Sequence, residues 1–192
     1  GTVQPLKRWP IARPYQFYRK MPRERSRSVS WICPICRSRA WLLAAVLLDA
    51  EGAHFSFGAS VEEHRPEQCT GMLHELHQLI LRMVESPIPI LVAVRGQCLG
   101  GGLEVALAGH FIFVAPNASL GQPELKLGVF APAASCLLPE LVGPMRSLDL
   151  LLSGRNISGI EAANIGLARE AAEDPGQAAL SYFNEHLKPK SA

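Results

Sequence analysis

Residues 88–108 read IPILVAVRGQCLGGGLEVALA, and this stretch decides the fold class. The apolar run Ile88 to Val94 has the length and composition of a strand buried on both faces. Three consecutive glycines at 100–102 predict a tight turn, and the small and apolar residues from Leu103 to Ala108 predict a short helix. A buried strand that leads through a glycine turn into a helix is typical of α/β proteins.

The alternation of strands and helices continues on both sides of this stretch. A short apolar run at 44–48 predicts a second buried strand, and apolar residues at helical spacing from Met72 to Val84 predict an amphipathic helix that Pro87 ends. Further elements are predicted as a strand at 111–115 and helices at 144–152, 159–165 and 176–187. Residues 41–192 are therefore predicted to form one α/β domain with parallel strand pairing.

Residues 1–40 differ from this domain in both charge and pattern. They hold ten of the nineteen Lys and Arg residues against one acid, Glu24, whereas the remaining 152 residues are acidic overall. The segment has no helical or strand period, and we expect it to be an irregular appendage. Cys33 and Cys36 have the spacing of half a zinc site, but no second pair follows at finger-like distance, so we expect no metal site. A basic run without a recognition motif also does not indicate nucleic-acid binding.

Composition limits where the protein is expected to act. Five cysteines, an odd number mostly in apolar stretches, are typical of free thiols in a reducing compartment, and we expect a cytoplasmic protein. The longest apolar run, Ala40 to Leu48, is about half the length that crosses a membrane. We therefore expect no membrane span and no export signal.

The glycine turn and Glu104 form the first candidate chemical group. Glycines before a helix allow backbone N–H groups to approach a ligand, and the helix dipole favours negative charge at the same place. Glu104 follows two residues later among apolar neighbours. Desolvation there raises the pKa of a carboxyl group and the N-terminus of its own helix lowers it, which suits a group tuned for proton exchange. Close packing of the turn and a first-turn helix acid are the structural alternatives, and Glu104 by itself fits either interpretation.

Glu124 is the second candidate, in the polar loop Ser119 to Glu124 after the predicted strand at 111–115. Two carboxylates that follow neighbouring parallel strands lie at the same end of a sheet, where α/β folds bind ligands. Such a pair can hold one water molecule between its members. The alternative for Glu124 is an acid at the start of a helix after Pro123.

These motifs together resemble the crotonase (enoyl-CoA hydratase/isomerase) superfamily over about residues 44–188. The resemblance rests on Gly100-Gly101-Gly102-Leu103-Glu104, on Gly121-Gln122-Pro123-Glu124 and on the loop Phe55-Ser56-Phe57-Gly58-Ala59-Ser60. It implies a spiral of ββα units, here truncated at both ends, and assembly as a homotrimer or hexamer. It also implies an oxyanion hole formed by the backbone N–H groups of Ala59 and Gly101, with Glu104 and Glu124 as the catalytic acid/base pair. No cofactor is implied, because coenzyme A enters as part of the substrate.

The sequence after the second glutamate bears on the acyl group. Ala131-Pro132-Ala133-Ala134-Ser135 replaces the glycine-rich stretch usual in the family, and Ser60 replaces an acid. The retained glutamate pair implies a hydratase that adds water to, or removes it from, a conjugated enoyl-CoA or cyclic dienoyl-CoA. Residues 130–136 are similar to those of family hydratases that act on cyclohexadiene-carbonyl-CoA, so a cyclic dienoyl-CoA is expected in preference to a straight-chain substrate. The residues expected to contact the thioester are Phe55, Ser56, Phe57, Gly58, Ser60, Gly100, Gly102, Pro123, Phe130, Ala131 and Pro132. The alternatives are a family isomerase and a truncated, non-catalytic scaffold.

Overall fold

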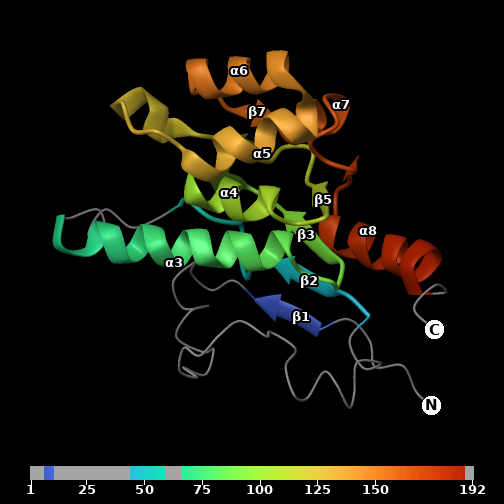
Figure 1. The fold of residues 1–192 in the computed structure, drawn as a ribbon. Coiled ribbons are helices and arrows are strands. Elements are labelled where there is room, and N and C mark those ends of the chain that lie inside the picture. The colour runs from blue at the N-terminus through green and yellow to red at the C-terminus, as the bar shows by residue number, and fades with distance from the viewer. Residues whose placement is uncertain (1–6, 11–43, 59–65, 189–192) are drawn as a thin grey trace, which may run out of the picture.

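The computed structural model describes residues 7–10, 44–58 and 66–188, and its centre is a parallel β-sheet (Figure 1). The strand order is β1-β2-β3-β5-β8, and every neighbouring pair is parallel. The strands are β1 (Lys7–Pro10), β2 (Val46–Asp49), β3 (Ile90–Val94), β5 (Phe111–Val114) and β8 (Glu170–Ala171). The predicted α/β class with parallel pairing is confirmed.

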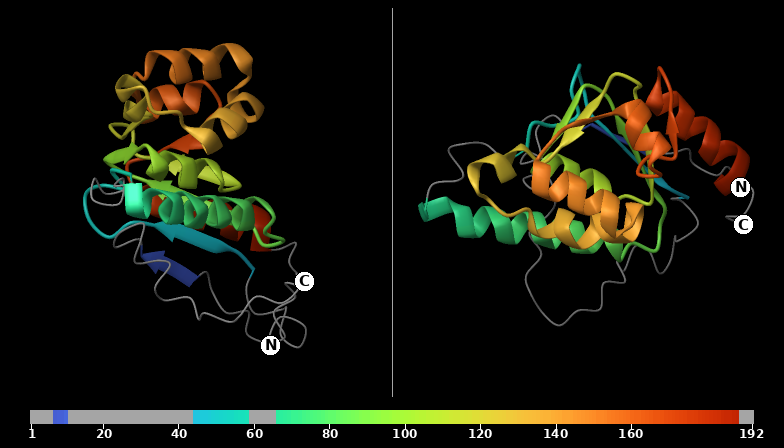
Figure 2. Two further views of the ribbon diagram at one scale, coloured as in Figure 1. Left: turned by 60° about the vertical axis from the view of Figure 1, so that its left-hand side comes forward. Right: turned by 90° about the horizontal axis from the view of Figure 1, so that it is seen from above.

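Both faces of this sheet are covered, as the apolar run of β3 predicted. Val92 and Val94 belong to a core cluster that includes Ile80 and Met83 of α3 (Pro66–Val84). Leu91 and Ala93 of β3 point the other way. They belong to a second cluster with α8 (Pro175–Tyr182) and the π-helical turn Phe183–Leu187 that follows it. Helices α3 and α8 therefore lie on opposite faces of the sheet (Figure 2).

A second, smaller sheet was not predicted from the sequence. It contains β4 (Gln97–Leu99), β6 (Ser119–Gly121) and β7 (Ile157–Ser158), in the order β4-β6-β7. Strands β4 and β6 are parallel, and β7 is antiparallel to β6. Each has only two or three residues, which is too short for a recognisable alternating pattern.

Helices α4 (Gly101–Leu107), α5 (Pro132–Val142) and α6 (Pro144–Ser153) stack above α3 in Figure 1. The prediction for α6 is confirmed, with Gly154 as its left-handed C-cap. The prediction of α7 (Gly159–Asn164) is also confirmed, with Ser158 as its N-cap. Helix α5 was missed because Pro132 and Pro139 interrupt its sequence, although Pro132 stands at the helix start, where proline is tolerated.

The N-terminal segment departs from its prediction at four residues. Lys7–Pro10 form a strand that pairs in parallel with β2, so the expectation of a wholly irregular segment is wrong there. Residues 11–43, with Cys33 and Cys36, lie outside the described residues, and the domain boundary at residue 40 stays a prediction. Within the described ranges, no helix is both long and apolar enough to cross a bilayer.

Candidate active site

Glu104 is buried in α4 and is held by the start of another helix. Its side chain is 3% exposed. One carboxylate oxygen, Oε1, accepts hydrogen bonds from the backbone N–H groups of Ala133 at 2.9 Å and Ala134 at 3.0 Å. These residues belong to the first turn of α5, whose N–H groups have no partner within their own helix. Glu104 therefore caps α5, a helix that begins 28 residues further along the chain.

Opposing effects act on the pKa of Glu104. Burial raises it above its ordinary value, because the charged form is desolvated. The N–H groups of Ala134 and Ala133 and the nearby His77 act in the opposite direction, and burial prevails. The sequence predicted this opposition, but it assigned the lowering effect to the N-terminus of α4 instead of to α5. A carboxyl group with a raised pKa can exchange a proton nearer to neutral pH.

Glu124 lies against the glycine turn. Gly100 has a φ of 55°, a conformation that favours glycine. A Cβ atom built on Gly100 would be 2.7 Å from Oε1 of Glu124 and 3.1 Å from its Oε2. The carboxylate of Glu124 thus occupies the space beside the Gly100 backbone, one residue before Gly101.

A short 3-10 helix, η2 (Pro123–Leu127), carries Glu124 and starts with Pro123. The side-chain amide of the preceding residue, Gln122, is 1% exposed and faces the carboxylate. With its nitrogen turned towards Glu124, the amide donates to Oε1 at 2.9 Å and to Oε2 at 3.2 Å, whereas the opposite orientation would bring oxygen atoms together. Gln122 therefore orients the half-buried Glu124.

The two glutamates follow neighbouring parallel strands, but not the strands that the sequence suggested. Glu104 follows β4 and Glu124 follows β6, which are paired in the smaller sheet. A hydrogen bond of 2.9 Å from Gly100 N–H to the carbonyl of Gly121 closes the ends of these strands together. The prediction that Glu104 and Glu124 follow neighbouring strands at one end of a sheet is confirmed. The prediction that Glu124 directly follows the strand at 111–115, which is β5, is wrong.

The loop at 55–58 reaches the same glycine turn. A Cβ atom on Gly58 would be 3.5 Å from the backbone nitrogen of Gly101 and 3.2 Å from the carbonyl oxygen of Leu99. Gly58 N–H donates to Oγ of Ser56 at 3.1 Å, which curls the loop. Ala59 and Ser60, which come next, lie outside the described residues, so their predicted roles stay predictions.

The predicted substrate contacts divide into two groups. Phe57 and Phe130 are 66% and 67% exposed, and they offer apolar surface beside the glycine turn and η2. Phe55 and Ala131 are buried in the core cluster, and Gly102 is packed against the Ser56 side chain, whose Oγ would be 2.7 Å from an added Cβ. The second group therefore supports the loops by packing, and its predicted contact with the thioester stays a prediction.

Two further polar side chains at the site escaped the sequence analysis. Gln122 adjoined the Pro123-Glu124 motif, and its position was the only signal that could have indicated it. His77 carried no signal beyond its place on a helix. The described residues contain no group of three or more His, Cys, Asp or Glu side chains suited to a metal ion.

Comparison with known proteins gives matches over most of the chain. Residues 40–182 match the family described as enoyl-CoA hydratase/isomerase. The chain is 64% identical over 150 residues to a cyclohexa-1,5-dienecarbonyl-CoA hydratase of Thauera aromatica, covering 78% of this chain and 58% of that protein. It is 38% identical over 138 residues to a probable enoyl-CoA hydratase of Bacillus subtilis (strain 168), covering 69% and 54% of the two chains.

Solved structures with the same arrangement include an enoyl-CoA hydratase from Thermoplasma volcanium GSS1. It superposes with a TM-score of 0.70 at 26% identity, covering 77% of this chain and 60% of the other. A putative enoyl-CoA hydratase from Rhodopseudomonas palustris CGA009 gives a TM-score of 0.69 at 27% identity, with 77% and 59% covered. The chain thus spans less than two thirds of the length of each of these four proteins.

Proposed function

Since the chain belongs to the enoyl-CoA hydratase/isomerase family and has its α/β crotonase-like fold, we propose that it is an acyl-CoA hydratase that uses Glu104 and Glu124 as its acid/base pair. One observation carries the proposal. The carboxylate of Glu124 lies against Gly100, and Glu104 sits one helical turn beyond Gly101 on α4. One carboxylate thus lies beside the residue that precedes the Gly101 N–H group, and the other is carried by the helix that this group begins.

The thioester carbonyl would bind at Gly101. As the first residue of α4, Gly101 has an N–H group without an intrahelical acceptor. The loop that leads to Ala59 approaches this nitrogen through Gly58, so we propose the Ala59 N–H group as the second donor. As water adds, negative charge develops on the thioester oxygen, and preorganised donors stabilise that charge, each by about 3 to 4 kcal/mol.

The two glutamates would divide the proton transfers. Glu104 removes a proton from water as the oxygen bonds to the conjugated carbon chain, and Glu124 delivers a proton to the alpha carbon of the thioester. The buried Glu104, with its raised pKa, suits a base that works near neutral pH. Gln122, by donating to Glu124, fixes the direction of the second carboxylate.

A cyclic dienoyl-CoA is the proposed substrate. The relative from Thauera aromatica, at 64% identity, is a cyclohexa-1,5-dienecarbonyl-CoA hydratase. The exposed rings of Phe57 and Phe130 supply flat apolar surface suited to a six-membered ring. The substrate brings its own electron sink in the thioester, so the proposed reaction runs through protein groups and water alone.

Turnover of the purified chain tests the proposal. The chain is mixed with cyclohexa-1,5-diene-1-carbonyl-CoA or with crotonyl-CoA, and products are separated and weighed by mass spectrometry. We expect the cyclic thioester to gain one water and to react faster than the straight-chain one. A product of unchanged mass with a shifted double bond would indicate an isomerase. Absence of any reaction with a folded chain would favour the non-catalytic scaffold.

We also propose that the chain self-associates as a trimer or a pair of trimers and works in the cytoplasm. Helix α6 exposes Met145, Leu148 and Leu152, with Met145 and Leu152 at 78% and 80%. Such an apolar face is suited to contact with another copy. Light scattering of the parent and of a Leu152→Lys variant tests assembly, and cell fractionation tests location. A monodisperse parent monomer would refute the trimer.

A further inference from the structure

His54 makes two different contacts with a single imidazole ring. Its Nδ1 accepts a hydrogen bond of 3.1 Å from the backbone N–H group of Gln97, the first residue of β4. The same ring lies against the ring of Phe57, with 4.9 Å between the centroids and an interplanar angle of 64°. Aromatic rings attract one another in this edge-to-face arrangement. His54 thus connects the backbone of β4 to the ring of Phe57.

The loop that carries His54 lies close against the β3–β4 connection. The Ser56 N–H group donates to the carbonyl of Gln97 at 2.9 Å. Gly96 has a φ of 59°, and a Cβ atom added there would collide with the carbonyl oxygen of Ala53 and with Nδ1 of His54. The absence of a side chain at Gly96 therefore allows the imidazole to reach the β4 backbone.

Phe57 stands next to the point where this loop meets the glycine turn. A Cβ atom on the following residue, Gly58, would be 3.5 Å from the nitrogen of Gly101, at which the thioester carbonyl is proposed to bind. The Phe57 side chain is 66% exposed, so most of its surface is open to a ligand. An exposed side chain can adopt several rotamers, and a neighbour that packs against one of them favours it.

We propose that His54 is a positioning residue for Phe57, which holds that ring ready to lie against the six-membered acyl ring of a cyclic thioester. This inference rests on the proposed function, because it takes the thioester carbonyl to bind at Gly101. Fixing the Phe57 ring before binding removes part of the ordering cost of binding. A flat acyl ring gains more from this prepared surface than a straight chain does, so His54 favours the cyclic substrate.

Affinities for two unreactive thioesters test the inference without turnover. Benzoyl-CoA carries a flat six-membered ring and butanoyl-CoA carries a saturated straight chain. Isothermal titration calorimetry gives the Kd of each thioester for the full parent chain, for His54→Asn, for Phe57→Leu and for the double variant. Asn retains an acceptor oxygen for the Gln97 N–H group but has no ring, so His54→Asn removes the ring contact and keeps the contact with β4.

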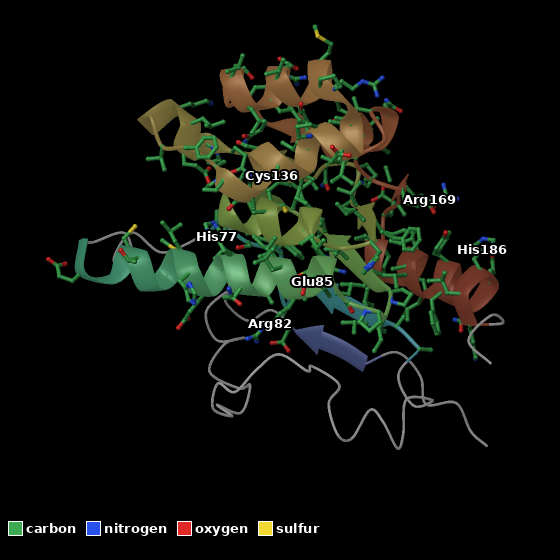
Figure 3. All side chains as sticks on the ribbon, in the orientation of Figure 1. His77, Arg82, Glu85, Cys136, Arg169 and His186 are labelled. Carbon is green, nitrogen blue, oxygen red and sulfur yellow. The ribbon has the colours of Figure 1, made fainter. Side chains whose placement is uncertain are left out.

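His186→Asn is the matched control. His186 is exposed, and its ring lies 4.9 Å from the ring of Tyr182 at an interplanar angle of 56°, close to the geometry of the His54 pair. It belongs to the turn after α8, on the opposite face of the larger sheet from α4 (Figure 3). The control therefore removes an equivalent ring contact away from the glycine turn, and both affinities should stay within about twofold of the parent.

We expect His54→Asn and Phe57→Leu each to weaken the binding of benzoyl-CoA by about threefold to tenfold, the factor that an aromatic pair contributes. Butanoyl-CoA affinity should change by less than about twofold. The double variant should bind benzoyl-CoA no more weakly than Phe57→Leu alone, because His54 acts through Phe57. Additive losses in the double variant, or equal losses for the two thioesters, would overturn the inference.

Turnover of the same proteins separates this inference from the proposed function. A preference for benzoyl-CoA that is lost in His54→Asn, in a parent that hydrates no thioester, would retain the role of His54 and refute the proposed function. Hydration by a parent whose affinities do not respond to His54→Asn would do the reverse. A folded parent that binds neither thioester would overturn both. If His54→Asn does not fold, His54→Gln takes its place in the same measurements.

Discussion

Glu104 and Glu124 are held in place by different kinds of contact. Glu104 is almost fully buried and is held by two backbone N–H groups of α5. Glu124 is half-buried on a short 3-10 helix and is held by the side chain of its neighbour Gln122. One carboxylate is thus held by the backbone of a helix distant in sequence, and the other is contacted by the side chain of its neighbour in the chain.

This difference predicts different costs for disturbing each group. Backbone donors at the start of α5 cannot move without moving the helix, so loss of their acceptor is felt in stability. The Gln122 amide is a buried side-chain group, and it can turn about its terminal torsion without moving the backbone. We therefore expect changes to Glu104 to affect both folding and the proposed chemistry, and changes to Glu124 to affect mainly the proposed chemistry.

The largest effect is expected on turnover. Glu104→Gln and Glu124→Gln should each reduce kcat for the dienoyl-CoA by at least about a hundredfold, because each removes a positioned acid or base. Glu140→Gln, an exposed change on α5, serves as the control. Steady-state kinetics of the three variants check this, and a double Gln variant as fast as the parent would contradict the paired mechanism.

A smaller effect is expected on the free energy of unfolding, and it should differ between changes at Glu104 and at Glu124. Glu104→Ala leaves the Ala133 and Ala134 N–H groups without their acceptor and should lower the free energy of unfolding by about 2 kcal/mol. Glu124→Ala should cost less than about 1 kcal/mol, since its partner Gln122 can reorient. Urea unfolding at fixed pH compares them. Equal losses in the free energy of unfolding would contradict the prediction that the hydrogen bonds from α5 to Glu104 stabilise the fold more than the Gln122 contact does.

The Gly100→Ala variant tests the close contact between the Gly100 backbone and the Glu124 carboxylate. The positive φ of Gly100 disfavours alanine by about 1 to 2 kcal/mol, and the new Cβ would displace the Glu124 carboxylate, so kcat should also fall. Gly71→Ala in α3 is the matched control. Nothing lies within 4 Å of its added Cβ, and the change should stabilise the helix by about 0.5 to 1 kcal/mol. Thermal unfolding and steady-state kinetics of both variants check this. Full activity of Gly100→Ala would contradict the expected displacement of the Glu124 carboxylate.

The dependence of stability on pH should differ between the two sites. Because the folded state raises the pKa of Glu104 from 4.5, it holds the proton more tightly than the unfolded chain. The stability from this group is complete below pH 4.5 and is lost as pH rises through the raised value, with a slope of at most about 1.4 kcal/mol per pH unit. Glu104→Gln should remove this slope, and Glu124→Gln should retain it. Urea unfolding across pH measures both, and identical slopes in the two variants would contradict the prediction.

Local sequence patterns sufficed for much of the fold. The helix α3 followed from its apolar spacing and Pro87, and β3 followed from a continuous apolar run. Both signals come from residues close together in the chain. The smaller sheet and α5 were missed because strands of two or three residues have no period and because two prolines obscure the helix. The strand at Lys7–Pro10 was missed because the charges around it conceal a four-residue element whose partner lies 39 residues away.

The sequence by itself determined that an α/β chain presents a glycine turn and two glutamates at adjacent strand ends. It could not determine how each carboxylate is held. The hydrogen bonds from Ala133 and Ala134 to Glu104 join residues 29 and 30 positions apart, and the burial of Glu104 raises its pKa. Only the tertiary structure decided these relations, because desolvation and charge act through space and leave no periodic mark along the chain.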